Sequence, residues 1–294
     1  MQTRFLGNDA VGRTEIGVIG LGCMPFDQRG DKPRDQLLET VSTAVEAGVV
    51  LVDTADAYGP AGELGEQAMG ANERLVASLL DELGLRDRVL VATKAGHVRT
   101  ADGGWALDGS PSHLERAVDA SRERLGVDVI DLWQHHRPDP DVPYEQTLEA
   151  LKRVHDSGKV RMLGLSNADT DQIVLAKQVL GDALVSVQNE FSPAFRTSRP
   201  EIDMCAGLGL TFLAWSPLGG ISDAGSLGDK HPAFADVART HGVTPQQVTL
   251  AWEIAQSPCV VPIPGASRPQ SVAASAAASE VVLAEAELAA LDAS

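Results

Sequence analysis

The chain has 294 residues, 44% of them hydrophobic and only 4% aromatic, and acidic residues outnumber basic ones by 41 to 24 for a formal net charge of -17. Nucleic acid and anionic membranes both attract basic protein surfaces, so this balance argues against either as the main partner. No run approaches the roughly 20 apolar residues of a membrane-spanning helix, and no secretory leader pattern opens the chain, so we expect a cytoplasmic protein.

Short apolar runs alternate with segments of helical periodicity along the chain. Strands are predicted at residues 16–22, 49–53, 88–94, 129–134, 160–166, 184–190, 210–216 and 259–265. Helices follow, with clear examples at residues 35–48, 110–126, 144–159 and 244–257, and the Ala-rich residues 271–294 are also predicted to be helical. Ser110 suits an N-cap, and Gly48 and Gly126 suit the C-terminal ends of their helices.

This alternation predicts repeated strand–helix units around a parallel sheet. Eight such units within this length fit an α/β fold of the (β/α)8 TIM-barrel type. A doubly wound open sheet is the alternative, because periodicity alone does not distinguish the two. Residues 4–17 could form an N-terminal β-hairpin that closes the bottom of the barrel. No polar linker divides the chain, so we expect a single domain over residues 1–294.

Polar side chains follow nearly every predicted strand. In a TIM barrel the active site lies at these C-terminal strand ends. In chain order they are Asp53 and Tyr58, Lys94, His135 and His136, Ser166 and Asn167, Gln188 and Asn189, Trp215 and Ser216, and finally Gly265, Ser267 and Arg268. Each alone has a structural explanation, such as a solvated lysine or a turn aspartate, and Asp56 is assigned to the turn. Their convergence on one face is what indicates a catalytic site.

Several other chemistries lack their sequence motifs. His135 and His136 are adjacent, so a strand would direct their rings to opposite faces, and HExxH is absent. The three cysteines lie far apart without CxxC spacing, which favours free thiols in a reducing compartment. GxSxG, Walker and GxGxxG motifs are also missing. We therefore expect no metal, although a metal-dependent barrel hydrolase remains an alternative.

A set of tyrosine, lysine, aspartate and histidine suits the reduction of a carbonyl group. A phenol has a pKa near 10, which a neighbouring ammonium lowers, and a carboxylate beside the lysine keeps that ammonium charged. A histidine could orient the carbonyl oxygen. The chain carries no redox group of its own, so the hydride must come from a cofactor.

These residues stand in motifs that resemble the aldo-keto reductases over essentially the whole chain. The segments are DTADAYG, VLVATKAG, DLWQHHRPDPDVPYEQTLEALKRVHDSGKVRMLGLSN, VSVQNEFSP, WSPLGG and VVPIPGASRP, in the order typical of the family. The resemblance implies a (β/α)8 barrel that reduces aldehydes or ketones with NADPH. It implies that Tyr58 is the proton donor and that Lys94 lowers the pKa of Tyr58. It also implies that the Asp53 carboxylate positions Lys94 and that His136 is the catalytic histidine.

The resemblance also implies how the chain would hold NADPH. Arg268 and Ser267 match the adenosine 2′-phosphate site, and a guanidinium suits a phosphate. The remaining cofactor contacts implied are Gly22, Cys23, Asp53, Ser166, Asn167, Gln188, Trp215, Ser216, Leu218, Gly219, Gly265 and Ser275. Ser275 stands where relatives commonly carry a longer amide that holds the adenine.

The expected partner is a small carbonyl compound. The predicted pocket wall consists of Met24, Phe26, His97, Trp105 and His135. This mixture of apolar and polar groups leaves sugar-derived ketones, small aldehydes and pyridoxal open. A non-catalytic NADPH-binding subunit, like the barrel subunits that regulate ion channels, is the alternative function.

Overall fold

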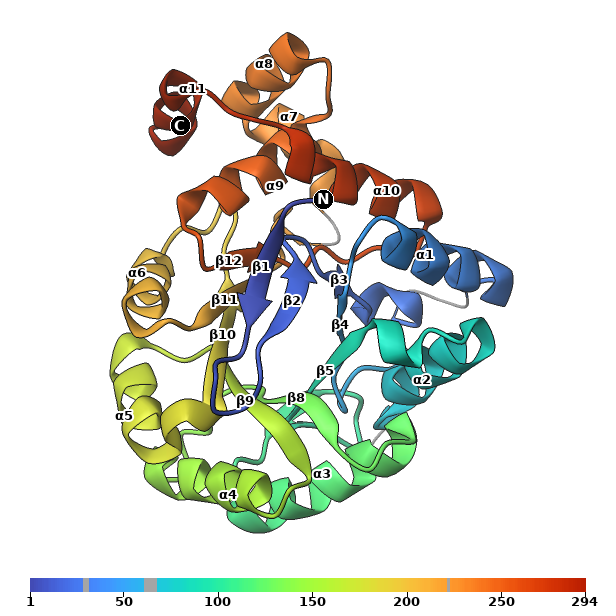
Figure 1. The fold of residues 1–294 in the computed structure, drawn as a ribbon, viewed down its shortest axis with the longest axis vertical. Helices are drawn as coiled ribbons and strands as arrows, with labels where there is room; N and C mark the ends of the chain where they lie inside the picture. Colours follow the sequence, from blue (N-terminus) through green and yellow to red (C-terminus); the bar gives the residue numbers. More distant parts are fainter. Residues whose placement is uncertain (29–31, 61–67, 221–222) are drawn as a thin grey trace.

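The centre of the molecule is a ring of parallel strands surrounded by helices (Figure 1). The computed structural model describes residues 1–28, 32–60, 68–220 and 223–294. The ring strands, in spatial order, are β3 (Leu21–Gly22), β4 (Leu51–Asp53), β5 (Leu90–Ala95), β8 (Ile130–His135), β9 (Val160–Ser166), β10 (Leu184–Glu190), β11 (Thr211–Trp215) and β12 (Val260–Pro262). The eight predicted strands are therefore present, each close to its expected position.

Backbone hydrogen bonds close the ring between its first and last strands. The amide of Gly20 donates to Pro262 at 2.9 Å and that of Gly22 to Pro264 at 3.1 Å, and Gly22 forms a parallel bridge with Gly265. A Cβ atom on Gly22 would lie 3.0 Å from the Ile263 carbonyl oxygen, so glycine permits this close approach. The barrel prediction is confirmed over the open sheet.

Helices cover the outside of the barrel (Figure 1). They are α1 (Arg34–Glu46), α2 (Ala71–Leu83), α3 (Pro111–Leu125), α4 (Tyr144–Asp156), α5 (Thr170–Leu180), α6 (Arg199–Leu208), α7 (Leu227–Lys230), α8 (Pro232–His241), α9 (Pro245–Gln256), α10 (Pro269–Ala277) and α11 (Glu285–Asp292). Short 3₁₀ turns are η1 (Met24–Phe26), η3 (Arg86–Arg88), η4 (Gly181–Ala183), η5 (Ala224–Ser226) and η6 (Ala278–Glu280). The predicted caps of α3 are confirmed, since Ser110 accepts from the His113 amide and Gly126 ends the helix with φ 69°, whereas the C-cap of α1 is Ala47, one residue before the predicted Gly48.

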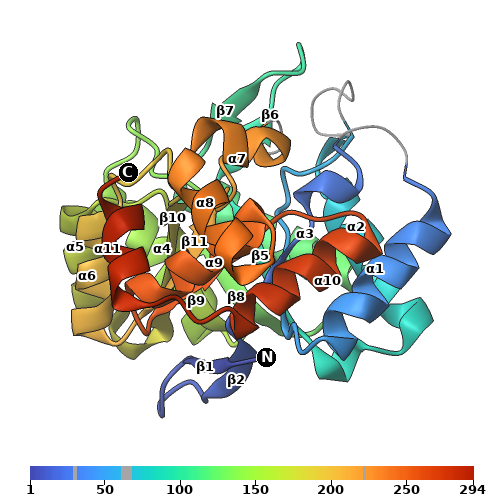
Figure 2. The same cartoon turned by 90° about the horizontal axis from the view of Figure 1, so that it is seen from above.

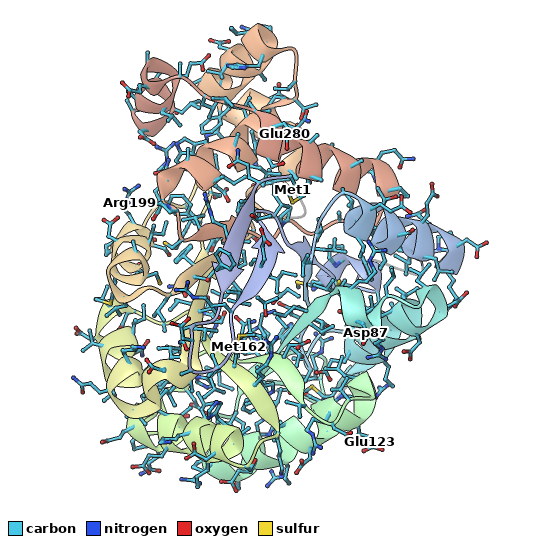
Figure 3. All side chains as sticks on the ribbon, in the orientation of Figure 1. Met1, Asp87, Glu123, Met162, Arg199 and Glu280 are labelled. Carbon is cyan, nitrogen blue, oxygen red and sulfur yellow. The ribbon has the colours of Figure 1, made fainter. Side chains whose placement is uncertain are left out.

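A hairpin seals the N-terminal end of the barrel, as predicted. Its strands, β1 (Thr3–Leu6) and β2 (Thr14–Gly17), pair antiparallel. Leu6 and Ile16 are fully buried and pack against inward-facing residues such as Met162, which Figure 3 labels inside the ring of helices. The first predicted strand is therefore corrected: Ile16 and Gly17 belong to the hairpin, and only Leu21 and Gly22 join the barrel.

A second hairpin was not predicted from the sequence. It consists of β6 (His97–Arg99) and β7 (Trp105–Leu107) and follows the third barrel strand. Figure 2 shows it at the opposite end of the barrel from β1 and β2, which is the end where the parallel strands finish. It therefore stands at the edge of the expected active site.

The N-terminus is anchored to the last helical segments. The Met1 ammonium lies 3.4 Å from the Glu280 carboxylate, and both residues are labelled in Figure 3. Among the described residues, no helix combines the length and the apolar character needed to cross a bilayer.

A carboxyl group is buried in α9 without compensation. Glu253 is 0% exposed, and neither carboxyl oxygen has a hydrogen-bond partner within the described parts of the chain. Burial raises the pKa of Glu253 well above its ordinary value, since a charged carboxylate there would be poorly solvated. A carboxyl with a higher pKa when folded binds more protons in the folded state, so the free energy of unfolding falls as pH rises above about 4.3.

We predict that Glu253→Gln stabilises the protein at pH 8 by about 1 kcal/mol or more, because burial of an unpaired charged group costs more than burial of a neutral amide. The gain should shrink toward pH 4, where the wild-type carboxyl is mostly protonated in both states. Urea unfolding at the two pH values measures the difference. Glu149→Gln, on the exposed face of α4, is the matched control and should show no such gain. An equal effect of Glu253→Gln at both pH values would contradict the prediction.

Candidate active site

A cavity of about 1140 Å³ opens where the barrel strands end. It brings together most of the predicted site residues. Those lining it are Gly22, Met24, Asp53, Tyr58, His97, Trp105, His136, Ser166, Asn167, Gln188, Trp215, Ser216, Leu218, Gly265, Ser267 and Arg268. These residues come from the ends of seven barrel strands and from the hairpin β6–β7, which follows β5, so the barrel assembles one site from distant parts of the sequence.

A buried ion pair lies at the wall of this cavity. Lys94 Nζ is 2.6 Å from Asp53 Oδ1, and the two residues are 0% and 3% exposed. The same ammonium donates to the Thr54 carbonyl oxygen at 2.9 Å and to the Tyr58 phenolic oxygen at 3.3 Å. Asp53 ends β4 and Lys94 lies in the neighbouring β5, so parallel pairing sets their separation. The three hydrogen bonds use the three protons of the ammonium.

Two glutamines hold the other oxygen of Asp53. Gln188 donates to Oδ2 at 2.9 Å and Gln134 at 3.2 Å, and the two amides also bond each other. A side chain on Gly164 of the intervening strand β9 would lie 2.9 Å from Gln134 Cγ, so glycine leaves the space that this amide fills. Gln134 was not predicted as a site residue, although its spacing of two from His136 places both on the inner face.

His136 follows β8 and faces Tyr58 across the cavity wall. The two ring centroids are 5.6 Å apart in an edge-on arrangement. The ring of His97 also lies against the His136 imidazole, at a centroid distance of 4.3 Å. The amide of His136 donates to the Ala95 carbonyl oxygen at 2.8 Å, which fixes its backbone to the end of β5.

Burial and the charge of Lys94 act in opposite directions on Tyr58. Burial raises the pKa of the phenol. The Lys94 ammonium lowers that pKa, but by less than burial raises it. The expectation that Tyr58 would have a lowered pKa is therefore wrong for the net shift, although the lysine acts in the expected sense. For Lys94, burial alone would lower the pKa, but Asp53 and Tyr58 raise it above the ordinary value. Lys94 is thus charged and Tyr58 protonated at neutral pH.

The histidines of the cavity are neutral. Burial lowers the pKa of His136 well below its ordinary value, and the nearby Lys94 lowers it further. Burial, Arg137 and Lys94 likewise lower the pKa of His97 to about 4. An imidazole of this kind presents one N–H and one lone pair rather than a positive charge.

The backbone is strained at two predicted cofactor residues. Asn167 and Ser216 have φ of 57° and 50°, the two positive values found for non-glycine residues in the described chain. Such conformations cost about 1–3 kcal/mol and cluster at ligand sites. Trp215, beside Ser216, has a buried indole N–H without a partner among the described residues. The cavity wall therefore fits a ligand with polar groups along its length.

The far end of the cavity suits a phosphate. Ser267 and Arg268 line it immediately before α10, whose N-terminal amides carry a partial positive charge. Within the described residues Arg268 forms no ion pair. Gln36 of α1 donates to the Ser267 carbonyl oxygen at 2.6 Å and so fixes this turn.

Two predicted pocket residues lie outside the cavity. His135 is fully buried on the opposite face of β8, where its ring lies 5.7 Å from that of Tyr144. Because neighbouring residues of a strand point to opposite faces, His136 can face the cavity only if His135 does not. Phe26 packs in the core beneath α1 with Leu37 and Val41. His97 and Trp105 lie on the wall as predicted, because β6 and β7 carry them there.

Three predicted cofactor residues also do not line the cavity. Cys23 is buried in the core and its thiol points back to the Leu21 carbonyl oxygen at 3.8 Å. Gly220 lines the cavity instead of Gly219. Ser271 does so instead of Ser275, since Ser271 lies one turn closer to the N-terminus of α10.

Asn72 is a buried polar residue that the sequence analysis missed. Its side chain accepts from Thr54 Oγ1 at 2.7 Å and donates to the Cys23 carbonyl oxygen at 3.0 Å and to Asp27 Oδ1 at 2.9 Å. It thereby ties the end of β4 to the turn after β3. No motif marks an asparagine at a helix N-terminus as a support for an active site. In the described chain no cluster of residues is arranged to hold a metal ion.

Comparisons with known proteins agree with this geometry. The sequence model of the Aldo/keto reductase family matches residues 18–294. A 6-dehydroglucose reductase of Novosphingobium aromaticivorans is 37% identical over 95% of this chain and 90% of its own. Two aldo-keto reductase structures from Klebsiella pneumoniae, one with NADP and acetate and one with NADPH, have TM-scores of 0.78 and 0.80. They are 27% and 26% identical, and the matches cover 95% and 100% of this chain and 92% and 95% of theirs. The chain belongs to the aldo/keto reductase family.

Proposed function

We propose that this protein reduces aldehydes or ketones with NADPH and that Tyr58 donates the proton. The observation that carries the proposal is the contact of Lys94 with both Asp53 and Tyr58 at the wall of the cavity. An ammonium only donates hydrogen bonds, so Lys94 occupies a lone pair of the phenolic oxygen and leaves the Tyr58 proton available to a substrate. The bound cofactor would supply the hydride to the carbonyl carbon.

Proton transfer from Tyr58 creates a phenolate in a buried position. Burial disfavours this anion, and the Lys94 charge 3.3 Å away favours it. Asp53 in turn keeps Lys94 protonated, because an uncompensated buried ammonium would lose its proton more easily. Lys94 therefore acts most strongly when negative charge develops on Tyr58, as a transition-state interaction should.

His136 orients the carbonyl oxygen in this proposal. Its imidazole is neutral at neutral pH, so it offers a directed N–H rather than competing with Tyr58 as an acid. Its edge-on contact with the Tyr58 ring keeps the two polar groups near one another. A carbonyl oxygen between them would accept from both.

The remaining wall would hold the cofactor. Ser166, Asn167 and Gln188 would bind the nicotinamide carboxamide, with Trp215 against the ring. Ser216, Leu218 and Gly220 would lie along the pyrophosphate, and Ser267 and Arg268 would bind the 2′-phosphate, all positions that line the cavity. A guanidinium at a helix N-terminus gives this phosphate both charge and directed donors.

We also infer a small-molecule carbonyl substrate and a cytoplasmic location. One relative is named a 6-dehydroglucose reductase, so sugar-derived aldehydes are the first compounds to test as substrates. Cys23, Cys205 and Cys259 are all free thiols, which suits a reducing compartment.

We predict that Tyr58→Phe lowers the rate of carbonyl reduction by about 10²- to 10⁴-fold, the usual contribution of a general acid. NADPH binding, measured by quenching of tryptophan fluorescence, should change little. Tyr144→Phe is the matched control because the other tyrosine of the chain lies outside the cavity, and its hydroxyl has no partner among the described residues. Wild-type turnover in Tyr58→Phe would disprove the assignment.

We predict that Arg268→Ala weakens NADPH binding about 10- to 100-fold, the value of a lost charge-assisted contact. NADH lacks the 2′-phosphate, so its dissociation constant should rise much less. Titration of both cofactors measures the ratio, with Arg116→Ala on the exposed face of α3 as the control. An unchanged ratio would mean that another residue binds the 2′-phosphate.

A further inference from the structure

Arg137 is a cation at the substrate end of the cavity that the proposed reaction does not use. It follows His136 and lines the cavity together with Tyr58, His97 and Trp105. Its charge reaches this part of the site, because Arg137 contributes to the lowered pKa values of both His97 and His136. The guanidinium therefore lies close to the groups proposed to receive the carbonyl.

The Arg137 side chain is held in place on one side. Its Nη2 donates to Asn167 Oδ1 at 3.1 Å. Asn167 is itself fixed, since its amide donates to the His136 carbonyl oxygen and to Ser166 Oγ, both at 3.0 Å. A guanidinium has five N–H donors, and within the described residues this is the one side-chain hydrogen bond that Arg137 makes. Its other donors are available to a ligand.

The local charge near Arg137 is not neutralised by the protein. Lys94 is paired with Asp53, whereas Arg137 has no carboxylate within 4.0 Å in the described chain. Arg137 acts on Glu190, whose pKa burial raises although the charge of Arg137 lowers it. Such a cation is notable in a chain of net charge -17, where acidic partners are abundant.

The neighbouring wall suits the carbon skeleton of a small substrate. Met24 and Trp105 supply apolar surface, and Trp105 is 43% exposed at the rim on β7. Arg99 lies over the Trp105 ring, with its Cζ 4.4 Å from the centroid. The site therefore combines an oxygen-binding end at Tyr58 and His136, apolar sides and a cationic end.

We propose that the preferred substrates are aldehydes or ketones that also bear a carboxylate, and that Arg137 binds the carboxylate. This inference rests on the proposed carbonyl reduction. A planar guanidinium can give a carboxylate two parallel charge-assisted hydrogen bonds, which a neutral amide of the same shape cannot receive with equal strength. Arg137 thereby determines specificity, while Tyr58 and His136 perform the chemistry.

The test compares 4-formylbenzoate with 4-formylbenzamide, which differ in charge but hardly in shape. We expect wild-type kcat/KM to favour the carboxylate about tenfold or more at 150 mM salt. In Arg137→Gln the ratio should fall to about one. Arg153→Gln removes the same charge from α4, where Arg153 forms an exposed ion pair with Glu115 of α3, and it should retain the wild-type ratio.

Several results would overturn the inference. They are a wild-type ratio of one or less, a preference that survives in Arg137→Gln, or an equal loss in Arg153→Gln, which would indicate only a long-range effect of charge. Binding of 4-(hydroxymethyl)benzoate and its amide, followed by tryptophan fluorescence, tests Arg137 without turnover and should show the same tenfold preference. Preferential binding without turnover would disprove the proposed reaction but support the carboxylate site. Turnover without a preference for the carboxylate would support the proposed reaction but disprove the carboxylate site.

Discussion

The buried ion pair between Lys94 and Asp53 is the interaction on which the rest of the site depends. Each charge would cost several kcal/mol in this environment without compensation. The 2.6 Å contact, the Thr54 carbonyl and the Gln188 amide provide that compensation. Since Asp53, Lys94 and Gln188 come from separate strands, the pair is compensated only when the barrel is closed. Removing either partner would leave the other as an unpaired buried charge and lower the free energy of unfolding by about 3–5 kcal/mol.

The hairpin at the opposite end of the barrel contributes to this electrostatic arrangement. Leu6 and Ile16 fill the N-terminal end together with apolar residues of the barrel interior, such as Leu132 and Met162. Water is excluded beneath the polar layer, so charges there interact more strongly than in solvent. The same exclusion explains why the pKa of Tyr58 is raised rather than lowered: the burial that strengthens the influence of Lys94 also disfavours the phenolate.

The features that follow from local periodicity could be predicted from the sequence. Strand ends of a closed barrel must meet, so the convergence of Asp53, Lys94 and His136 followed from the strand assignment. The hairpin β6–β7 was missed because its strands are three residues long and are separated by a polar, glycine-containing turn. Burial of loop residues depends on tertiary packing, which is why Phe26 was misplaced. The resemblance identified His136 as the catalytic histidine, but His135 was wrongly placed in the pocket wall, since neighbouring residues of β8 face opposite sides.

The position of Tyr58 depends on a helix as well as on the strands. The loop from Asp53 to Tyr58 has no regular structure beyond β4, and the start of α2 supports it. The Asn72 amide donates to the Tyr58 carbonyl oxygen at 3.3 Å, while its side chain holds Thr54. The next residue, Glu73, is fully buried and paired with Arg124 of α3 at 2.5 Å. Packing of α2 against α3 is therefore transmitted to the proposed proton donor, so a change at this helix interface should shift Tyr58 relative to Lys94 without any change in the barrel itself.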